Sequence, residues 1–427
     1  MHAPIESRLV PTVSVRASIM RGAAAVLALA LAALCPFRFA AQAPKATSDQ
    51  PPSSRVVTGD RVVPNQAYSP AILAGKTLYL AGHLGRDPKT QQLPSGIRDQ
   101  TRHAMDNVGT VLRAAGMTHG NLVKCHVYLA SMDDYAGMNE TYRGYFPERV
   151  PARTTIEAAG LPQGAAIEIS CVAYADVSAI SVVRPRAGSL PAPLGPYSAA
   201  VWAADTLYLS GMGGQFPDGR PLPATLGGQV AQTLVNIETT LKAAGLSFSD
   251  VVSGESYVTV PEEAEAFDGP YLPAFASPAA HARAMVFVPR LPGGIKSELT
   301  MVAARSSVGR RVIPPAGKGD ARARAVRAGD VLYARTESAE DAGPGPEEQY
   351  RKVLERQEAT LRAAGLGWTD VVDVQMYLSD LRDMDVLNRI FRERFPHDPP
   401  ARTTIRVLSR GARIQSSLVA VKAGATR

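Results

Sequence analysis

The chain has 427 residues, of which 45% are hydrophobic, 20% charged and 6% aromatic. This composition excludes a disordered or collagen-like chain, and at about 100–200 residues per domain the length predicts two to four folded domains. The three cysteines exclude a disulfide-dense scaffold and a cysteine-rich zinc module. The formal net charge is +7, but the first 43 residues hold four arginines and one glutamate, so the remainder carries only +4. That surplus is too small to indicate a nucleic-acid partner.

The N-terminal part contains a short apolar run, AAAVLALALAAL at 23–34, which follows Arg21 and precedes a small-x-small sequence at 41–43. Its 12 residues are too few to span a bilayer, which takes roughly 20. A basic start, a short apolar run and a small-residue cleavage site are typical of a secretory signal peptide. We therefore expect residues 1–43 to be a signal peptide and the protein to be periplasmic or secreted. A buried N-terminal helix in a cytoplasmic protein is the alternative.

The segment after this run predicts neither a lipid anchor nor a membrane span. Cys35 follows a leucine, whereas a lipidation site requires a small residue there. Residues 44–56 form a polar linker rich in Pro and Ser. No later stretch reaches membrane-spanning length, so we expect no membrane span.

The remaining chain contains three copies of one pattern. Each copy has a β-rich run, a Leu-x-Ala-Ala-Gly phrase, a tyrosine 16 residues after the first residue of that phrase, and an Ala-Arg phrase. The Leu-x-Ala-Ala-Gly phrases are at 112–116, 241–245 and 361–365, the tyrosines are Tyr128, Tyr257 and Tyr377, and the arginines are Arg153, Arg283 and Arg402. A period of about 120–130 residues is too long for a solenoid. We expect three tandem domains of one fold, at 57–180, 181–308 and 309–425.

The first copy shows the order of elements that each domain should contain. Apolar residues at helical spacing predict two helices, alternating or β-branched runs predict strands, and Gly116 predicts the end of the first helix. In chain order we expect a strand at 77–82, a helix at 98–115, a strand at 122–130, a helix at 135–146, and strands at 151–159 and 165–175. Strands with hairpin-like neighbours and two helices favour an α+β domain with both helices on one face of the sheet.

The order of these phrases resembles the YjgF/RidA family of small imine/enamine deaminases over essentially the whole chain after the linker. The opening phrase is Gly195-Pro196-Tyr197-Ser198-Ala199 in the second copy and Ala67-Tyr68-Ser69 in the first, followed by Ser210-Gly211 and Ala81-Gly82. The Pro-Ala-Arg phrase is Pro151-Ala152-Arg153, His281-Ala282-Arg283 and Pro400-Ala401-Arg402. The late glutamate matches Glu168 and Glu298, with Gln415 in the third copy, and the helix asparagine matches Asn139 and Asn388, with Asp268 in the second copy.

This resemblance implies chorismate-mutase-like domains with ligand clefts between neighbours. Single-domain members of the family form trimers. Three RidA-like domains in one chain imply an intrachain pseudo-trimer, which avoids the association entropy of three separate chains. We therefore expect a monomer of three domains.

The resemblance also implies hydrolysis of reactive 2-imino or enamine acids to 2-keto acids and ammonia, without a metal or an organic cofactor. An arginine can hold the substrate carboxylate by two charge-assisted hydrogen bonds, and a nearby carboxyl can handle water and the leaving nitrogen. The resemblance assigns these roles as follows: Arg153 and Arg283 as carboxylate anchors, Glu168 and Glu298 as catalytic groups, and Tyr68, Tyr197, Gly82, Gly211 and Asn139 as substrate-binding residues.

Each of these residues also has a purely structural interpretation. An arginine after Pro-Ala commonly forms an interface salt bridge, a strand glutamate can be solvated, and tyrosines can be packing residues. His83 is interpreted as a hydrogen-bonded structural residue, and His281 replaces the proline before Arg283. Cys125 and Cys171 are interpreted as buried small hydrophobic residues rather than nucleophiles. The seven histidines show no metal-ligand spacing.

The third copy departs most from the pattern, which leaves the number of working sites open. It lacks the tyrosine phrase and has Arg335-Thr336 and Gln415 in place of Ser-Gly and Glu. We expect it to be structural, although Arg402 could still bind an anion. If the Arg–Glu pair of one domain meets the tyrosine of another, one complete site remains; if each site lies within one domain, two remain.

Two other functions compete with deamination. The first is a non-catalytic binding module for small carboxylate metabolites, which export away from cytosolic imine-forming enzymes would favour. The second is RNA cleavage, which the low aromatic content and modest charge argue against. The sequence leaves the side chain of the substrate undetermined.

Overall fold

The structure is a computed structural model, and it describes residues 55–58, 67–275, 277, 280–317 and 321–422. These residues belong to one compact unit of the chain, 49–427. The predicted signal peptide, 1–43, and most of the predicted linker lie outside the described residues. Within the described part, no helix is long and apolar enough to cross a membrane.

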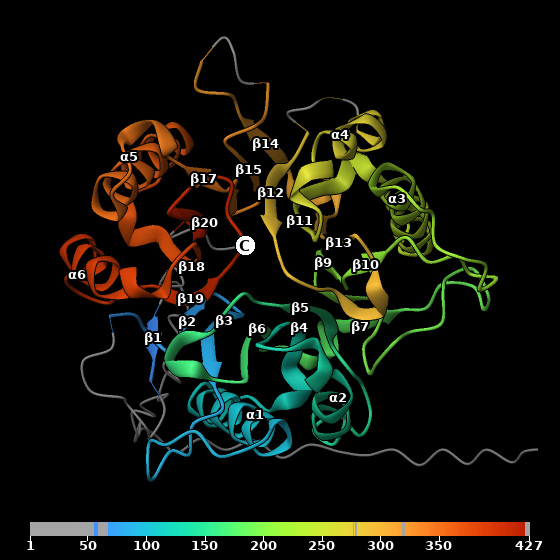
Figure 1. Ribbon diagram of the computed structural model, residues 1–427, viewed down its shortest axis with the longest axis horizontal. Helices are drawn as coiled ribbons and strands as arrows, with labels where there is room; N and C mark the ends of the chain where they lie inside the picture. Colours follow the sequence, from blue (N-terminus) through green and yellow to red (C-terminus); the bar gives the residue numbers. More distant parts are fainter. Residues whose placement is uncertain (1–54, 59–66, 276, 278–279, 318–320, 423–427) are drawn as a thin grey trace, which may run out of the picture. The chain divides into compact units, whose positions relative to one another are not determined.

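Three modules follow one another in this unit, and each is a sheet covered by two helices (Figure 1). Module 1 has the strand order β1-β2-β3-β6-β4-β5, in which only β4 and β5 run parallel. Its elements are β1 (Arg55–Val57), β2 (Ala71–Ala74), β3 (Thr77–Leu84), α1 (Ile97–Ala114), β4 (Leu122–Leu129), α2 (Tyr135–Arg143), β5 (Ala152–Glu157) and β6 (Ile167–Tyr174).

Modules 2 and 3 repeat this arrangement. Module 2 contains β7 (Ile180–Val183), β8 (Ala200–Ala203), β9 (Thr206–Leu209), β10 (Met212–Gly213), α3 (Leu226–Ala243), β11 (Val251–Val258), α4 (Glu265–Tyr271), β12 (Ala282–Phe287) and β13 (Ser297–Ala304). Module 3 contains β14 (Arg310–Ile313), β15 (Ala325–Ala328), β16 (Val331–Ala334), β17 (Glu337–Ser338), α5 (Pro346–Ala364), β18 (Val371–Leu378), α6 (Met384–Arg394), β19 (Ala401–Arg406) and β20 (Ile414–Val421). The parallel edge pairs are β11 with β12 and β18 with β19. The α+β fold class expected from the sequence is confirmed.

The repeated Leu-x-Ala-Ala-Gly phrase forms the end of the long helix in each module. Its glycines, Gly116, Gly245 and Gly365, have φ of 74°, 73° and 75°. This left-handed conformation stops a helix and favours glycine. The apolar stripe of α1, which includes Ala104, Val108 and Leu112, is buried with α2 against the sheet, so both helices cover one face as expected.

The expected hairpin-like adjacency of the last two strands is wrong. β6 lies between β3 and β4, and β5 pairs only with β4, in parallel. The Leu-Pro-Gln-Gly segment between these strands, residues 161–164, therefore does not close a hairpin but carries the chain across β4. As a result, β5 is the free edge of its sheet, and the same holds for β12 and β19.

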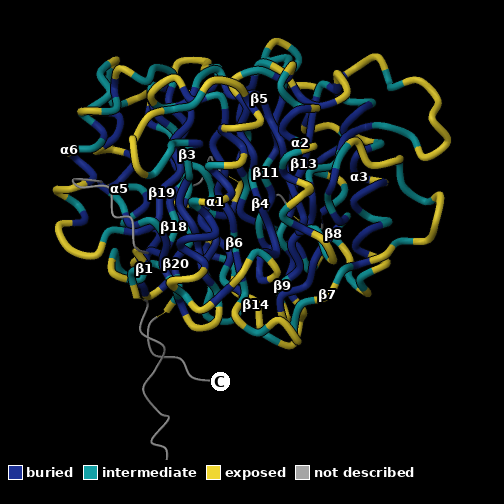
Figure 2. Tube along the Cα trace, turned by 90° about the horizontal axis from the view of Figure 1, so that it is seen from below, coloured by how far each residue is buried: buried dark blue, intermediate teal, exposed yellow. Residues whose placement is uncertain are grey.

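The three sheets face one another inside the unit, and the helix pairs lie outside (Figure 1). Every pair of modules is joined by main-chain hydrogen bonds: Ser198 N to Pro151 O at 3.1 Å, Thr336 N to Arg283 O at 3.2 Å, and Ser69 N to Pro400 O at 3.1 Å. Buried residues fill the middle of the unit, and exposed ones follow its rim (Figure 2). Apolar clusters between modules include one that contains Tyr128, Tyr257 and Tyr377.

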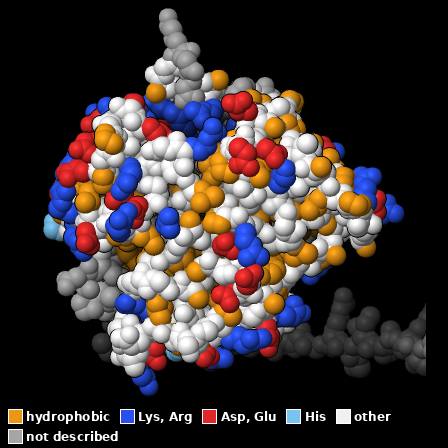
Figure 3. Space-filling model, in the orientation of Figure 1, with side chains coloured by type: hydrophobic (Ala, Val, Ile, Leu, Met, Phe, Trp, Pro, Cys, Tyr) orange, Lys and Arg blue, Asp and Glu red, His pale blue; other side chains and the backbone are white. Residues whose placement is uncertain are grey.

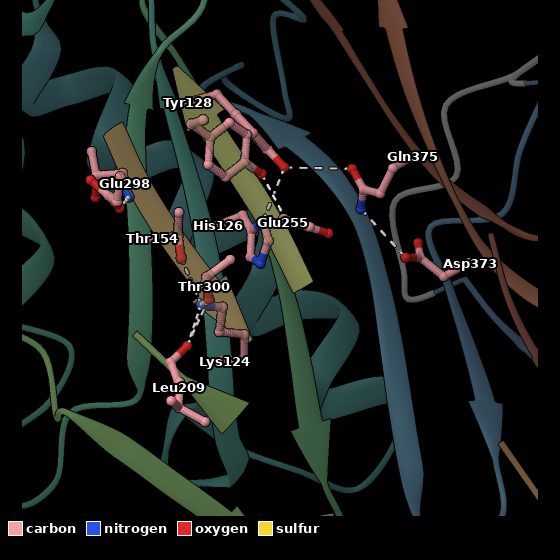
Figure 4. Close-up of polar contacts among 12 residues, drawn as sticks. Lys124, His126, Tyr128, Thr154, Leu209, Glu255, Glu298, Thr300, Asp373 and Gln375 are labelled. Atoms are coloured by element: carbon pink, nitrogen blue, oxygen red, sulfur yellow. Dashed lines mark hydrogen bonds and ion pairs between the residues drawn. The ribbon is translucent and has the colours of Figure 1, made fainter. Parts of the chain in front are cut away.

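Between the sheets, equivalent strands present different polar residues (Figure 4). β4 contributes Lys124 and His126, whereas β11 has Glu255 and β18 has Asp373 and Gln375 at the equivalent positions, around a cavity of about 110 Å³. Polar contacts of these side chains join module 1 to module 2 and to module 3. His126 Nδ1 lies 3.7 Å from Glu255 Oε2, Tyr128 OH donates to Gln375 Oε1 at 3.5 Å, and Gln375 donates to Asp373 at 3.4 Å.

Lys124 makes the strongest of these polar contacts. Its residue is 4% exposed, and its Nζ donates to Thr154 Oγ1, Leu209 O and Thr300 Oγ1, each at 2.7 Å. Two of these acceptors belong to module 2. Burial lowers the pKa of Lys124 to about 7, and a buried ammonium requires such a complete set of acceptors.

The two strand cysteines of module 1 are buried, as expected, but they form a disulfide that the sequence does not predict. Cys125 on β4 and Cys171 on β6 are directly opposed in the antiparallel register, with Cα atoms 4.2 Å apart. This separation is near the short end of the range that a disulfide bridges. The bond ties the two central strands of module 1 together.

Reduction of this bond should destabilise the protein. It joins cysteines 46 residues apart, and the chain-entropy estimate for such a loop is about 4 kcal/mol. We expect a reductant to lower the free energy of unfolding of the wild type in guanidinium by roughly this amount. The double variant Cys125→Ala/Cys171→Ala is the control, and its stability should not respond to the reductant. An identical loss in that variant would contradict the assignment.

Candidate functional site

The arginines of the Ala-Arg phrases lie on the free edge strands β5, β12 and β19, and each edge docks on the next module. The main-chain N of Arg153 donates to Ser210 Oγ at 2.8 Å, and Gly211 N donates to Arg153 O at 2.9 Å. Each docked edge carries its arginine into a cleft between two modules. The three clefts are named by their modules: cleft 1/2, cleft 3/1 and cleft 2/3.

Cleft 1/2 is a cavity of about 240 Å³ that contains Arg153 from module 1 and Tyr197 and Glu298 from module 2. Arg153 is 2% exposed. Its guanidinium lies over the rings of Tyr135, Tyr142 and Tyr197, at 5.7, 5.1 and 5.5 Å from their centroids, and it donates to Tyr135 OH at 3.2 Å. The aromatic faces hold the cation in place while its edge remains available to an anion.

Glu298 projects from β13 toward the same cavity and is 5% exposed. Its Oε1 accepts a hydrogen bond from Thr155 N at 3.4 Å. Burial raises the pKa of Glu298 to about 7. Gly211 leaves room for this carboxyl, because a Cβ at this position would overlap Glu298 Oε1.

Cleft 3/1 is a cavity of about 320 Å³ with the same plan. Arg402 from module 3 is 2% exposed and lies over the ring of Tyr68 from module 1, 4.7 Å from its centroid. Its Nη2 donates to Asn388 Oδ1 at 2.7 Å. Glu168 from module 1 is 3% exposed, and burial raises its pKa to about 8, although the main-chain N–H of Thr404 donates to it.

Buried polar atoms without partners concentrate in cleft 3/1. Among the described residues, Glu168 Oε2, Arg402 Nε and Nη1, His83 Nε2 and Arg86 Nε have no hydrogen-bond partner. Buried polar groups are normally paired, so a group of unpaired ones lining a cavity indicates a place for a polar ligand. A Cβ at Gly82 would overlap Glu168 Oε1, as at Gly211 in cleft 1/2.

Cleft 2/3 lacks this arrangement of an available arginine opposite a buried glutamate. Arg283 is paired with Asp268 Oδ1 at 2.5 Å, where the other modules have Asn139 and Asn388. The adjoining cavity contains Thr336 and Gln415 in place of glycine and glutamate. Arginines of module 3, including Arg324 and Arg356, line a neighbouring cavity. Figure 3 shows a group of Lys and Arg side chains in the upper part of the molecule, in the region where Figure 1 labels β15 and β17.

The structure therefore divides the predicted site residues between two clefts. Arg153, Tyr197, Gly211 and Glu298 lie in cleft 1/2, with Asn139 close to Arg153 beside Gly195. Tyr68, Gly82 and Glu168 lie in cleft 3/1, whereas Arg283 lies in cleft 2/3, where Thr336 and Gln415 stand at the positions of the glycine and the late glutamate.

The pairing of Arg153 with Glu168 assumed from the sequence is wrong. β4 separates β5 from β6, so the arginine and the glutamate of one module face different neighbours. Each complete cleft instead takes its arginine from one module and both its glutamate and its tyrosine from the next. In the third copy, for which the sequence left open only that Arg402 could bind an anion, Arg402 and Asn388 line cleft 3/1. The Pro-Ala-Arg phrase of the third copy was the signal for this role.

The histidines near the clefts are neutral. His83 lines cleft 3/1 and donates to Pro70 O, and burial lowers its pKa to about 4. His281 shares a 2.6 Å hydrogen bond with Tyr271 OH. The described residues contain no group of three or more His, Cys, Asp or Glu side chains placed to hold a metal ion.

Comparison with known proteins matches each module separately. The sequence profile of the family described as Endoribonuclease L-PSP matches residues 58–175, 188–305 and 322–422. A RutC family protein from Pyrococcus horikoshii is 42% identical over 120 residues, which cover 28% of this chain and 95% of that protein. The rat protein named 2-iminobutanoate/2-iminopropanoate deaminase is 42% identical over 108 residues, 25% of this chain and 79% of the relative. A crystal structure of RidA from an Antarctic Psychrobacter is 32% identical, covers 28% of this chain and 98% of its own, and has a TM-score of 0.27.

The raised pKa values of Glu168 and Glu298 should make the stability of the protein fall as the pH rises. Both carboxyls are protonated in the folded chain well above 4.5, the ordinary value, so the stability that this protonation gives is lost as the pH rises through about 7 and 8. We expect the free energy of unfolding of Glu168→Gln, relative to that of the wild type, to be higher at pH 9 than at pH 4 by several kcal/mol, about 5 kcal/mol for the full shift in pKa.

Urea unfolding across the pH range measures this difference. Gln415→Asn, which changes the equivalent side chain in cleft 2/3, is the matched control and should keep the wild-type slope with pH. Parallel pH curves for wild type and Glu168→Gln would show that this carboxyl is ionised in the folded protein.

Proposed function

Because the chain belongs to the Endoribonuclease L-PSP family and contains three copies of its domain, we propose that it hydrolyses reactive 2-imino or enamine acids to 2-keto acids and ammonia in clefts 1/2 and 3/1. One observation carries the proposal. In each of these clefts a buried arginine from one module and a buried glutamate from the next line one cavity. The relatives named 2-iminobutanoate/2-iminopropanoate deaminase support the choice of reaction.

The arginine provides recognition and orientation. The substrate has a carboxylate next to an electrophilic C=N carbon, and the planar guanidinium of Arg153 or Arg402 can hold that carboxylate with two parallel hydrogen bonds. Its tyrosine neighbours fix the guanidinium by their aromatic faces. The imine carbon is thereby held beside the glutamate, and this positioning lowers the entropic part of the barrier.

The glutamate moves the protons. Near neutral pH, Glu168 and Glu298 are at least partly protonated because burial raises their pKa values to about 8 and 7. Water forms a C–O bond to the imine carbon while the C=N electron pair moves to nitrogen, which takes the proton of the carboxyl. The added water returns a proton to the carboxylate. A second proton transfer from the carboxyl to nitrogen then accompanies C–N cleavage. The hydroxyl oxygen forms the C=O bond and gives its proton to the carboxylate, so that ammonia leaves, the 2-keto acid remains and the carboxyl is restored.

Arginine variants test this function. We expect Arg153→Lys and Arg402→Lys each to disable its own cleft, because lysine cannot make the two parallel bonds. The double variant should lose roughly 10- to 100-fold in kcat/KM, the equivalent of about 1.5–3 kcal/mol for a charge-assisted bond. The assay follows the 2-keto acid formed from 2-iminobutanoate generated in situ.

Arg283→Lys is the control, because Arg283 is already paired with Asp268, and it should retain wild-type activity. An inactive wild type that still binds carboxylates would favour the non-catalytic binding module. Cleavage of labelled RNA that survives in the double variant would place a nuclease function elsewhere.

We also propose that the mature protein is exported and works as a monomer of three modules. The predicted signal peptide and the disulfide between Cys125 and Cys171 support export, because disulfides persist in oxidising compartments. The contacts among all three modules within one chain support the monomer. We expect protein from the periplasm or medium to lack residues up to about Ala43 by intact mass, and to scatter light as a single chain. An intact N-terminus in the cytosol, or a trimer of chains, would contradict these proposals.

A further inference from the structure

The two complete clefts differ in the chemistry of their walls. One wall of cleft 1/2 is the segment between β7 and β8 of module 2, which contributes Pro185, Leu190, Pro191, Ala192, Pro193 and Leu194. Apart from Arg153, its charged lining residues are Glu298 and Arg186, and Arg186 is exposed. The space beside Glu298 is therefore mostly apolar.

Cleft 3/1 is larger and positively charged. Its volume is about 320 Å³, against about 240 Å³ for cleft 1/2. Its lining includes Arg86 and Arg392 in addition to Arg402, and among the described residues Glu168 is the single acidic residue of the lining. Because burial raises the pKa of Glu168 to about 8, that carboxyl offsets little of this charge near neutral pH.

Arg86 in cleft 3/1 and Gln215 in cleft 1/2 occupy equivalent positions, and they account for much of the difference in charge between the two clefts. Each lies four residues after the glycine that makes room for the glutamate, Gly82 or Gly211. Each loop is held in the same way by an asparagine of the long helix. Asn107 Nδ2 donates to Leu84 O at 3.1 Å and Arg86 O at 3.0 Å, and Asn236 Nδ2 donates to Gly213 O and Gln215 O, both at 2.9 Å.

The guanidinium of Arg86 has capacity for a ligand. Its Nε is buried, and no described residue accepts a hydrogen bond from it. Its charge acts on Tyr68, whose pKa it tends to lower against the larger effect of burial, so Arg86 lies near the tyrosine that covers Arg402. A donor that is buried without an acceptor costs free energy, and an anionic ligand group would recover that cost.

We propose that cleft 3/1 selects substrates with a second anionic group on the side chain, held by Arg86, and that cleft 1/2 selects substrates with an apolar side chain. This rests on the proposed function for the identity of the substrates. In cleft 3/1, Arg402 holds the carboxylate next to the reacting carbon, and Arg86 holds the distal one. In cleft 1/2, Gln215 offers no charge at the equivalent position, and the proline-rich wall covers the apolar chain. One polypeptide thus presents two substrate specificities.

Binding of unreactive carboxylates tests this selectivity without turnover. Isothermal titration calorimetry compares glutarate, a dicarboxylate, with butanoate, a monocarboxylate. The background Arg153→Lys leaves cleft 3/1 as the intact site, and Arg402→Lys leaves cleft 1/2. We expect glutarate to bind more tightly than butanoate in the first background and more weakly in the second.

Two matched variants exchange the equivalent residues: Arg86→Gln removes the charge from cleft 3/1, and Gln215→Arg introduces it into cleft 1/2. In the Arg153→Lys background, Arg86→Gln should weaken glutarate binding roughly 10- to 100-fold, as loss of a charge-assisted contact predicts, and leave butanoate binding unchanged. In the Arg402→Lys background, Gln215→Arg should strengthen glutarate binding. The two loops are held by equivalent hydrogen bonds from an asparagine to the main chain, so each exchange changes the side chain in the same backbone setting. Circular dichroism checks that each variant is folded.

An unchanged ratio of glutarate to butanoate affinity in Arg86→Gln would overturn the proposal. The two proposals fail separately. Selective binding without any 2-keto acid formation would refute the deaminase function and keep the selectivity. Deamination by both clefts with the same preference between 2-imino mono- and dicarboxylates would refute the selectivity and keep the function.

Discussion

The unpaired edge of each sheet is the constraint on which this architecture depends. β5, β12 and β19 have a partner strand on one side only, and a buried edge must satisfy its main-chain groups elsewhere. The next module does this, as in the bonds between Arg153 and Ser210, between Arg283 and Thr336, and between Pro400 and Ser69. Because the arginines sit on these strands, the bonds that join the modules also deliver each arginine to the neighbour's glutamate position. Assembly and site formation are therefore one event.

The polar interior then distinguishes the modules from one another. If three identical strands each brought a lysine or a glutamate to the same place, these side chains would repel one another or lack a partner of opposite charge. Here Lys124 and His126 stand on β4, whereas Glu255 stands on β11 and Asp373 on β18, so the strand with basic side chains meets two strands with carboxyl groups. A buried network of charged groups adds little net stability, because removing the charges from water costs free energy. Such a network nevertheless disfavours arrangements in which like charges meet. This interior therefore fixes which module lies next to which more than it strengthens the fold.

The sequence predicted the repeated fold well because its signals are local. The helical stripe of α1, the glycine that ends it and the alternating strands depend on periodicity within a few residues. Strand order depends on contacts far apart in the sequence, and there the expectation of a hairpin between β5 and β6 failed. The same failure misassigned the sites. Arg153 and Glu168 were expected to act together because they belong to one copy, whereas β4 separates their strands in the sheet. The disulfide between Cys125 and Cys171 was missed for a related reason, since only the antiparallel register of β4 and β6 brings these cysteines together.

Fusion of three copies into one chain removes a restriction that a trimer of identical chains must obey. In such a trimer, one substitution alters all three clefts, so none can lose its chemistry or change its walls alone. In this chain each cleft combines different residues, and the three have diverged independently. Asp268 neutralises Arg283 in cleft 2/3, whereas Arg86 and Gln215 give different walls to clefts 3/1 and 1/2. Cleft 2/3 still supplies the main-chain bond from Thr336 to Arg283. The replacement of the late glutamate by Gln415 therefore leaves this interface intact, and the other two clefts keep the geometry that the closed arrangement of modules imposes on them.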